Sequence, residues 1–170
     1  MTYAVLFLGF LVAQRLGELV IAQRNTRRLL ARGASEYGAD HYPVMVTLHA
    51  SWLAVLVVFG WNAEVHLGWL AVFGILQLGR VWVLATLGER WTTRIIVIDE
   101  PLVMRGPFRF IRHPNYATVA AEIAVAPLVL GLTWVAVLYT LLNAAMLYKR
   151  ISVEQAALSQ TADARNPATA

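Results

Sequence analysis

The sequence contains no cysteine, and this absence removes several kinds of chemistry. Disulfide bonds, thiolate catalysis and cysteine-ligated zinc all require that residue, and we expect no metal site in the chain. Charged residues are also scarce. They make up 14% of the 170 residues, whereas a typical soluble domain contains roughly 25%. So low a charge content is more typical of a membrane protein than of a soluble domain with a large core.

The apolar residues, which are 59% of the chain, gather in long segments that are almost free of charge. A bilayer core of about 30 Å requires around 20 helical residues. Three segments of about this length predict membrane helices: Tyr3–Ala22, Val44–Gly60 and Leu67–Leu87. The fourth apolar stretch, 117–148, has Pro127 and Gly131 near its middle, which favours a tight helical hairpin over one long span. A re-entrant hairpin is the alternative. We therefore predict an all-α integral membrane protein with about five transmembrane helices and a C-terminal helical hairpin.

The basic residues are concentrated in alternate connections between these segments. Twelve of the fourteen Lys and Arg residues lie in 23–43, in 88–116 or after residue 148, and none lies in 61–66 or 131–133. This alternation follows the positive-inside rule, so we expect an outside N-terminus, with the basic connections and the C-terminus in the cytosol. The same placement accounts for the net charge of +4, and we expect no nucleic-acid partner.

A few ionisable residues fall inside the predicted spans. By the topology above they share the cytosolic half of the membrane: Arg15, Glu18, His49, Arg80 and Glu122. Such groups cost roughly 2.5–3.5 kcal/mol each on insertion scales, so they usually face partners or a cavity. Their shared depth predicts a polar cavity, about 10 Å deep, in which Arg15, His49, Arg80 and Glu122 line a route for a substrate's polar head. Two simpler interpretations stay open: pairing of Arg15 with Glu18 at i, i+3, and extension of Arg80 towards the interface.

The connection 91–116 is rich in turn-forming and basic residues. Ile95–Ile98 is prone to form a short β-strand, and Leu102–Met104 is a candidate for a second strand after the turn signal at 99–101. Pro114 suits the first turn of the helix that follows. Such a basic loop could simply bind anionic lipid. However, its many turn residues favour a rigid loop that holds a shaped, polar ligand with side chains that include these: Arg105, Arg109, Arg112, His113 and Asn115.

Arg150 and Glu154 follow the last apolar stretch and lie at i, i+4, so they share one face of a helix. As an exposed ion pair they would contribute roughly a few tenths of a kcal/mol. In a functional interpretation, Arg150 orients an anionic group, and Glu154 binds a polar group of a cofactor or accepts a proton. We expect residues 1–160 to form a single membrane domain and residues 161–170 to form a disordered tail.

Two blocks of the sequence resemble the isoprenylcysteine carboxyl methyltransferase family. The first is GPFRFIRHPNY at 106–116, and the second is RISVE at 150–154, with Leu158 after it. The family pattern is G-P-Y-R-x-x-R-H-P-x-Y, then a hairpin, then R-I-x-x-E-E-x-x-L, so both the order and the spacing agree. The resemblance covers roughly residues 88–158. The chain departs from the pattern at Gln155, where the family usually has a second glutamate.

This resemblance implies an integral membrane methyltransferase that uses S-adenosylmethionine. It implies a cofactor site on the cytosolic side, within 88–158, and a lipophilic or lipidated substrate that enters from the bilayer. By position, Arg150 and Glu154 would be catalytic. The residues that would bind the cofactor are those of the turn before the hairpin: Arg112, His113, Pro114, Asn115 and Tyr116.

Glu122 and Pro127 make the chain more similar to a bacterial branch of the family. Some members of that branch look like O-methyltransferases of long-chain polyketides such as alkylpyrones or alkylresorcinols, which implies a location in the bacterial inner (plasma) membrane. The acceptor stays open between a carboxylate and a phenol or enol. Two other functions stay open as well: an NADPH-dependent membrane reductase of the steroid-reductase type, and a non-enzymatic lipid-binding or adaptor protein. The chain lacks the G-x-G-x-x-G fingerprint, although membrane reductases need not carry one.

Overall fold

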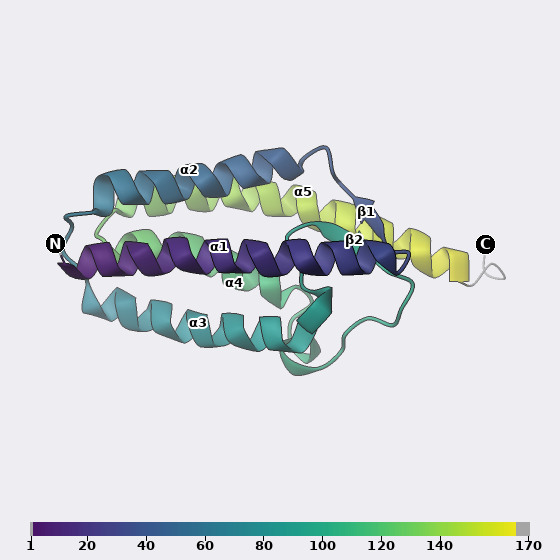
Figure 1. The fold of residues 1–170 in the computed structure, drawn as a ribbon. Coiled ribbons are helices and arrows are strands. Elements are labelled where there is room, and N and C mark those ends of the chain that lie inside the picture. The colour runs from purple at the N-terminus through teal and green to yellow at the C-terminus, as the bar shows by residue number, and fades with distance from the viewer. Residues whose placement is uncertain (1, 166–170) are drawn as a thin grey trace.

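The computed structural model describes residues 2–165, which form an elongated helical bundle (Figure 1). Its elements are five α-helices, two short 3-10 helices (η1 and η2) and a two-stranded sheet. In chain order they are α1 Thr2–Ala31, β1 Ser35–Tyr37, α2 Tyr42–Gly60, α3 Leu67–Leu87, η1 Gly88–Arg90, β2 Ile95–Val97, η2 Gly106–Arg109, α4 Pro114–Val129 and α5 Thr133–Arg165.

Three helical segments are long and apolar enough to cross a membrane: Thr2–Ala31, Tyr42–Gly60 and Leu67–Arg90. Their outward-facing side chains are largely apolar, as Ile75, Leu78 and Val81 on α3 illustrate, with 65–72% of their surface exposed. An apolar exterior of this kind is suited to lipid and not to water. The expectation of an integral membrane protein built from helices is therefore confirmed at this level.

The C-terminal hairpin is confirmed as well. α4 ends at Val129 and α5 begins at Thr133, and the turn between them contains Gly131 with φ of +68°. Residues other than glycine rarely adopt that backbone conformation, so glycine suits the turn. α4 lies inside the bundle, where it packs against both α3 and α5. Its residues Ile123, Ala126 and Val129 form one buried apolar cluster with side chains that include Leu11, Trp52, Leu56 and Phe73.

The sheet differs from the prediction. β2 pairs with β1, antiparallel, with Ser35 opposite Val97 and Tyr37 opposite Ile95, and residues 102–104 form no strand. Burial explains the choice of partner. Ile95 and Val97 are buried in a small apolar cluster with Ala157 of α5, which Tyr37 of β1 also contacts, whereas Leu102 and Met104 remain exposed. A strand was predicted at Ile95–Ile98 and is observed at Ile95–Val97, but its partner was not predicted.

Two helices extend beyond their predicted ends. α1 continues to Ala31, nine residues past the expected limit at Ala22. α5 continues to Arg165, so residues 161–165 are helical where a disordered tail was expected, and 166–170 lie outside the described residues. Strong helix formers such as Ala, Leu and Gln follow the apolar part of α5. Ala157 packs against β2 and is almost fully buried, which gives this extension a tertiary contact.

Candidate active site

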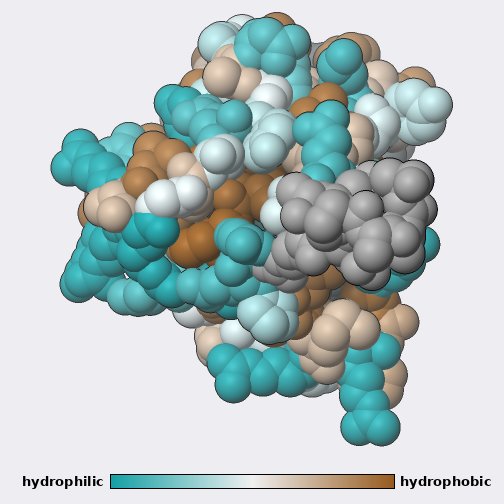
Figure 2. Space-filling model, turned by 90° about the vertical axis from the view of Figure 1, so that its right-hand side faces the viewer, coloured by the Kyte–Doolittle hydropathy of each residue, from teal (hydrophilic) through white to brown (hydrophobic). Residues whose placement is uncertain are grey.

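A pocket of about 480 Å³ lies at the end of the bundle where α5 extends past the other helices. Its walls come from the end of α3, the loop that follows it, the start of α4, and α5; the lining residues fall within 87–97, 102–108, 112–116 and 150–158. Seen from this end, apolar surface lies in a hollow surrounded by hydrophilic side chains (Figure 2). The volume is within the range of roughly 300–1,000 Å³ that is typical of small-molecule sites.

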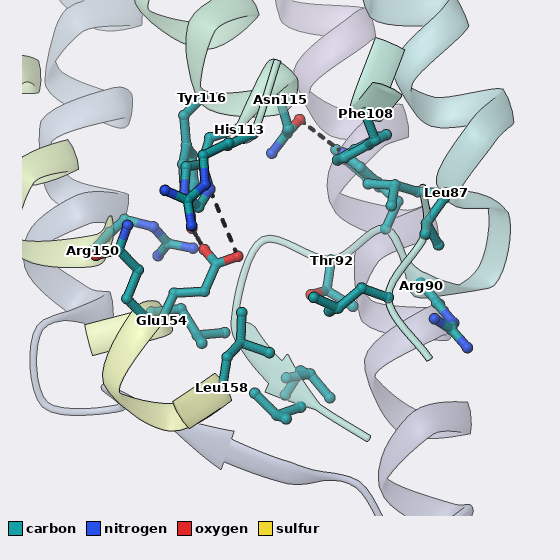
Figure 3. Close-up of a pocket in the computed structure, with 18 of the residues that line it drawn as sticks. Leu87, Arg90, Thr92, Phe108, His113, Asn115, Tyr116, Arg150, Glu154 and Leu158 are labelled. Carbon is teal, nitrogen blue, oxygen red and sulfur yellow. Dashed lines mark hydrogen bonds and ion pairs between the residues drawn. The ribbon is translucent and has the colours of Figure 1, made fainter. Parts of the chain in front are cut away.

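The pocket brings together the two blocks that the sequence had singled out (Figure 3). The turn before α4 and the first turn of that helix contribute Arg112, His113, Asn115 and Tyr116. α5 contributes Arg150 and Glu154. Pro114 does not line the pocket; it is the first residue of α4 and is buried beneath the turn. Residues more than thirty positions apart therefore share one cavity, because the hairpin returns α5 alongside the start of α4.

Glu154 lies beside two aromatic side chains, Tyr116 and His113. It accepts a hydrogen bond of 2.5 Å from the Tyr116 hydroxyl, and its other oxygen lies 4.0 Å from Nδ1 of His113. The rings of His113 and Tyr116 are stacked, with 5.6 Å between their centroids. The carboxylate thus has a fixed orientation on the pocket wall, with one strong donor and one imidazole beside it.

Arg150 is buried, with only 5% of its surface exposed. Its guanidinium donates to the backbone carbonyl of Thr93 at 3.0 Å and lies 3.0 Å from the sulfur of Met45. It does not pair with Glu154, and no carboxylate in the described part of the chain lies within 4.0 Å of it. A buried cation without an acidic partner is costly. Arg150 is therefore suited to bind an anionic group in the pocket.

Asn115 is positioned by residues that the sequence did not indicate. Its side-chain oxygen accepts a hydrogen bond of 3.1 Å from the indole N–H of Trp91, as the dashed line at Asn115 marks in Figure 3. Trp91 is in turn held by Asn25 of α1, whose amide donates to the carbonyls of Trp91 and Gly88 at 2.9 and 3.1 Å. This hydrogen bond uses the side-chain oxygen of Asn115, so its amide nitrogen can donate to a ligand in the pocket. These contacts join segments that are distant in the sequence, so no sequence motif indicates them.

Ion pairs fasten the pocket loop to the N-terminal part of the chain. Arg94 pairs with Glu36 of β1 at 2.5 Å, and this hydrogen bond raises the pKa of Arg94 above its ordinary value. Glu100 accepts from Arg90 and also pairs with Arg32 of α1. The hydrogen bond from Arg90 and the charge of Arg32 lower the pKa of Glu100. The loop is therefore held from two sides at neutral pH.

Three of the four residues expected to line a polar cavity, Arg15, Arg80 and Glu122, form an ion-pair network with Glu18 in the bundle. Glu122 of α4 is fully buried and accepts hydrogen bonds from Arg80 of α3 and Arg15 of α1, each at 2.5 Å. Gln77 donates to the same carboxylate at 2.9 Å. The expected pair of Arg15 with Glu18 is present at 2.8 Å. Two arginines and two glutamates thus neutralise one another, and the network joins α1, α3 and α4.

This network differs in two ways from what the sequence led us to expect. Arg80 does not reach towards the interface, because it is 3% exposed and bound to Glu122. The lining of the pocket, as the described residues form it, does not include Arg15, His49, Arg80 or Glu122. Nδ1 of His49 lies 2.9 Å from the carbonyl of Met45, one turn earlier in α2. The shared depth of Arg15, Arg80 and Glu122 is thus accounted for by their mutual pairing, and a route for a substrate's polar head stays a prediction.

Comparison with known proteins bears on the chemistry of this pocket. The model of the isoprenylcysteine carboxyl methyltransferase family matches residues 69–160, which is more than half of the chain and includes each described residue that lines the pocket. The chain belongs to the isoprenylcysteine carboxyl methyltransferase family. As a member, it has both the turn at 112–116 and the Arg150–Glu154 segment inside the matched region, whereas α1, β1 and α2 lie before it.

Two relatives that are similar in sequence are both described as uncharacterized proteins. The chain is 34% identical over 161 residues to YpbQ of Bacillus subtilis (strain 168), which covers 91% of this chain and 96% of that protein. It is 27% identical over 114 residues to a protein of Haemophilus influenzae (strain ATCC 51907 / DSM 11121 / KW20 / Rd), which covers 62% of this chain and 65% of the relative. No solved structure gives a significant match. Because it covers 91% of this chain, the match to the first relative extends into the helices that precede the family match.

Proposed function

We propose that this member of the isoprenylcysteine carboxyl methyltransferase family is an S-adenosylmethionine-dependent O-methyltransferase that acts on a lipophilic acceptor in the bacterial inner membrane. One observation carries the proposal: the turn 112–116 and the Arg150–Glu154 face of α5 line the same pocket. Family membership supplies the class of reaction. The distances and burial of these side chains supply the roles proposed below.

The pocket residues fit a cofactor that has an aromatic base at one end and charged groups at the other. Leu87, Ile95 and Leu158 provide apolar wall against which a purine can pack. Arg112, His113, Asn115 and Tyr116 would hold the polar groups, and Pro114 would fix the turn that carries them. When bound, S-adenosylmethionine supplies an electrophilic methyl group on a positively charged sulfur. Glu154 is the one carboxylate among the lining residues, and its negative charge favours a cation at this end of the pocket.

Arg150 is proposed to orient the acceptor. Its buried guanidinium is fixed by the Thr93 carbonyl and has no carboxylate partner among the described residues. An arginine in such surroundings can bind an anionic oxygen and remove it from water, and both effects favour attack on a methyl group. A carboxylate acceptor needs nothing more, because it is already ionised.

A phenol or enol acceptor must also lose a proton. Glu154 and His113 are the candidate bases, because both line the pocket and lie 4.0 Å apart. A base positioned within reach of the acceptor typically contributes about 10²–10⁴-fold to the rate. The proposal therefore includes two kinds of acceptor, which differ in whether they require this pair.

The membrane topology is part of the proposal. We propose that α4 and α5 add two spans to the three apolar helices, with the N-terminus outside and the pocket on the cytosolic side. The support is the placement of basic residues, which flank the pocket end of the bundle and are absent from 61–66 and 131–133. Lipophilic acceptors would then reach the pocket from the inner leaflet.

A titration of the purified full chain tests the class of reaction. We expect S-adenosylhomocysteine to raise the melting temperature, with a stabilisation of about 2.7 kcal/mol when its concentration is 100 times Kd. NADPH should have no such effect. His113→Ala should abolish the shift, and Glu64→Ala, at an exposed acid in the connection 61–66, should preserve it. A response to NADPH alone would indicate a reductase, and a response to neither would indicate a non-enzymatic protein.

A further inference from the structure

The segment 102–112 forms one wall of the pocket and also has an outer face, on which Arg105, Arg109, Phe110 and Ile111 have no part in the proposed reaction. This outer face combines exposed cations with exposed large apolar side chains. Leu102, Met104, Phe110 and Ile111 have 52–76% of their surface exposed. Arg105, Arg109 and Arg112 are exposed between and beside them. A water-facing loop would not usually present so many large apolar groups together.

The three arginines of this segment lack the acidic partners that neighbouring arginines have. In the described part of the chain, no carboxylate lies within 4.0 Å of Arg105, Arg109 or Arg112. By contrast, four arginines near the sheet are paired: Arg28 with Glu89, Arg32 and Arg90 with Glu100, and Arg94 with Glu36. Uncompensated positive charge therefore accumulates on the 102–112 segment.

Packing fixes the depth of this segment relative to the membrane helices. Gly106, in η2, has φ of +58°, and a β-carbon there would lie 2.6 Å from Oγ1 of Thr86 and 3.2 Å from the indole nitrogen of Trp82. η2 therefore lies directly on the last turns of α3. Trp82 is five residues before the end of that helix, or about 7.5 Å along its axis, and half of its surface is exposed. Tryptophan at such a position is typical of the membrane–water interface.

We propose that the 102–112 segment is a docking site for anionic phospholipids of the leaflet that borders the pocket. Guanidinium groups bind phosphate oxygens with paired, charge-assisted hydrogen bonds, which suits Arg105 and Arg109. Phe110, Ile111 and Met104 insert beside them among the acyl chains, as the apolar side of an interfacial segment does. Charge complementarity selects the partner, because a neutral headgroup has no net charge to offer the unpaired Arg105 and Arg109.

This docking has a consequence for the pocket itself. Leu102, Met104 and Arg112 belong both to the exposed face and to the pocket lining. A lipid-bound segment therefore fixes this wall of the pocket at the surface of the bilayer, where a lipophilic acceptor would arrive. The lipid site does not depend on the identity of the reaction, so it can be tested apart from the proposed function.

The absence of cysteine makes a single reporter possible. The full chain with Phe110→Cys, labelled with an environment-sensitive fluorophore, is placed in nanodiscs of phosphatidylcholine with increasing phosphatidylglycerol. We expect the emission to shift to the blue as phosphatidylglycerol increases. An arginine near an anionic surface is worth about fivefold in binding. The double change Arg105→Gln/Arg109→Gln should therefore lower the apparent affinity for phosphatidylglycerol about 30-fold.

The matched control is Arg24→Gln/Arg27→Gln, which removes the same charge from two exposed arginines of α1 and should leave the emission shift intact. A second label at Ile111→Cys repeats the measurement if the first labelled protein does not fold. Equal emission in both lipids would overturn the proposal, and so would an equal loss of the shift in the control. If inorganic phosphate in phosphatidylcholine nanodiscs reproduces the shift, the arginines bind a soluble anion and the lipid site is wrong.

Discussion

Arg150 and Glu154 lie one helical turn apart on α5, and they share Tyr116 as a neighbour, because the Arg150 guanidinium lies 5.7 Å from the centre of the Tyr116 ring. Arg150 reaches the carbonyl of Thr93 and the sulfur of Met45, whereas Glu154 reaches the Tyr116 hydroxyl. The two side chains do not bind one another, so a change in Arg150 removes neither partner of the hydrogen bond from Tyr116 to Glu154. Single substitutions can therefore separate orientation of the acceptor from removal of its proton.

We expect Glu154→Gln to affect the two kinds of acceptor differently. Glutamine keeps the size of the side chain and can still accept from Tyr116, but it has no negative charge and is no base. With a phenol or enol acceptor, kcat should fall about 10²–10⁴-fold if Glu154 is the base. With a carboxylate acceptor the loss should be far smaller. Radiolabelled S-adenosylmethionine incubated with lipid extracts, or with defined acceptors, measures both. Equal loss with both acceptors would assign Glu154 to cofactor binding instead.

Arg150→Ala should impair both reactions, because either acceptor presents an anionic oxygen. Removal of one preorganised donor to a developing or bound oxyanion typically costs about 10²–10³-fold in rate, and we expect a loss of that order in kcat/KM. Lys149→Ala is the matched control, since Lys149 is the exposed neighbour on the same helix. Unchanged turnover of Arg150→Ala at full cofactor occupancy would remove this residue from the mechanism.

At the scale of elements, α4 depends on a buried acid. Glu122 binds Arg80 of α3 and Arg15 of α1, so one carboxylate holds three helices in register. Glu122→Ala would leave two arginines inside the bundle with one acid between them. Loss of one partner from a buried ion pair costs about 3–5 kcal/mol, and we expect a fall in stability of that size by denaturant titration in detergent. Glu64→Ala should cause almost none; similar losses in both variants would contradict the role given to the network.

The loop that carries Glu100 should respond to acid. The folded pKa of Glu100 lies below its ordinary value of 4.5 because of the hydrogen bond from Arg90 and the charge of Arg32. The stabilising effect is therefore present above about pH 4.5, and it is lost as the pH falls through the folded pKa. Hydrogen exchange of residues 98–105 should increase over that acidic range. In Glu100→Gln the same residues should exchange faster at neutral pH and show a weaker acid response.

Some helices and strands could be predicted from the sequence and others could not, for physical reasons. α3 was predicted with its observed limits, because a long and largely apolar run is bounded there by His66 and Gly88. The hairpin was predicted because Pro127 and Gly131 interrupt one apolar stretch. β1 was missed, since three residues with no alternating pattern form a strand only through their distant partner. The contacts of Trp91 with Asn25 and Asn115 were missed for a similar reason, as they depend on tertiary packing alone.

The residues of the candidate site could likewise be predicted only in part from the sequence. The sequence singled out both Arg112–Tyr116 and Arg150–Glu154, and the pocket contains both except for Pro114. It also grouped Arg15, Arg80 and Glu122 correctly by depth, but depth alone does not distinguish a cavity from a closed ion-pair network. Their pairing could not be predicted from the sequence, because it depends on which faces of α1, α3 and α4 meet. The roles of all these residues in binding and catalysis stay predictions.

For the whole molecule, the proposed five spans place the two ends of the bundle on opposite sides of the membrane. Single cysteines test this directly, because the native chain has none. Asn62→Cys lies in an exposed connection and Ser159→Cys on the exposed extension of α5. We expect an impermeant maleimide to label the first in intact cells, and the second only after the membrane is opened. The reverse pattern would invert the topology, and labelling of both in intact cells would contradict a five-span bundle.

The reliance of the pocket on the N-terminal helices limits how this protein could be re-engineered. Asn25 supports Trp91, Glu36 binds Arg94, and Met45 contacts Arg150, although all three precede the region that matches the family. A shortened chain that kept only the matched region would lose each of these supports while retaining both signature blocks. Chimaeras designed to exchange acceptor specificity should therefore keep the junctions outside the bundle and inherit the first sixty residues from the same parent as the pocket.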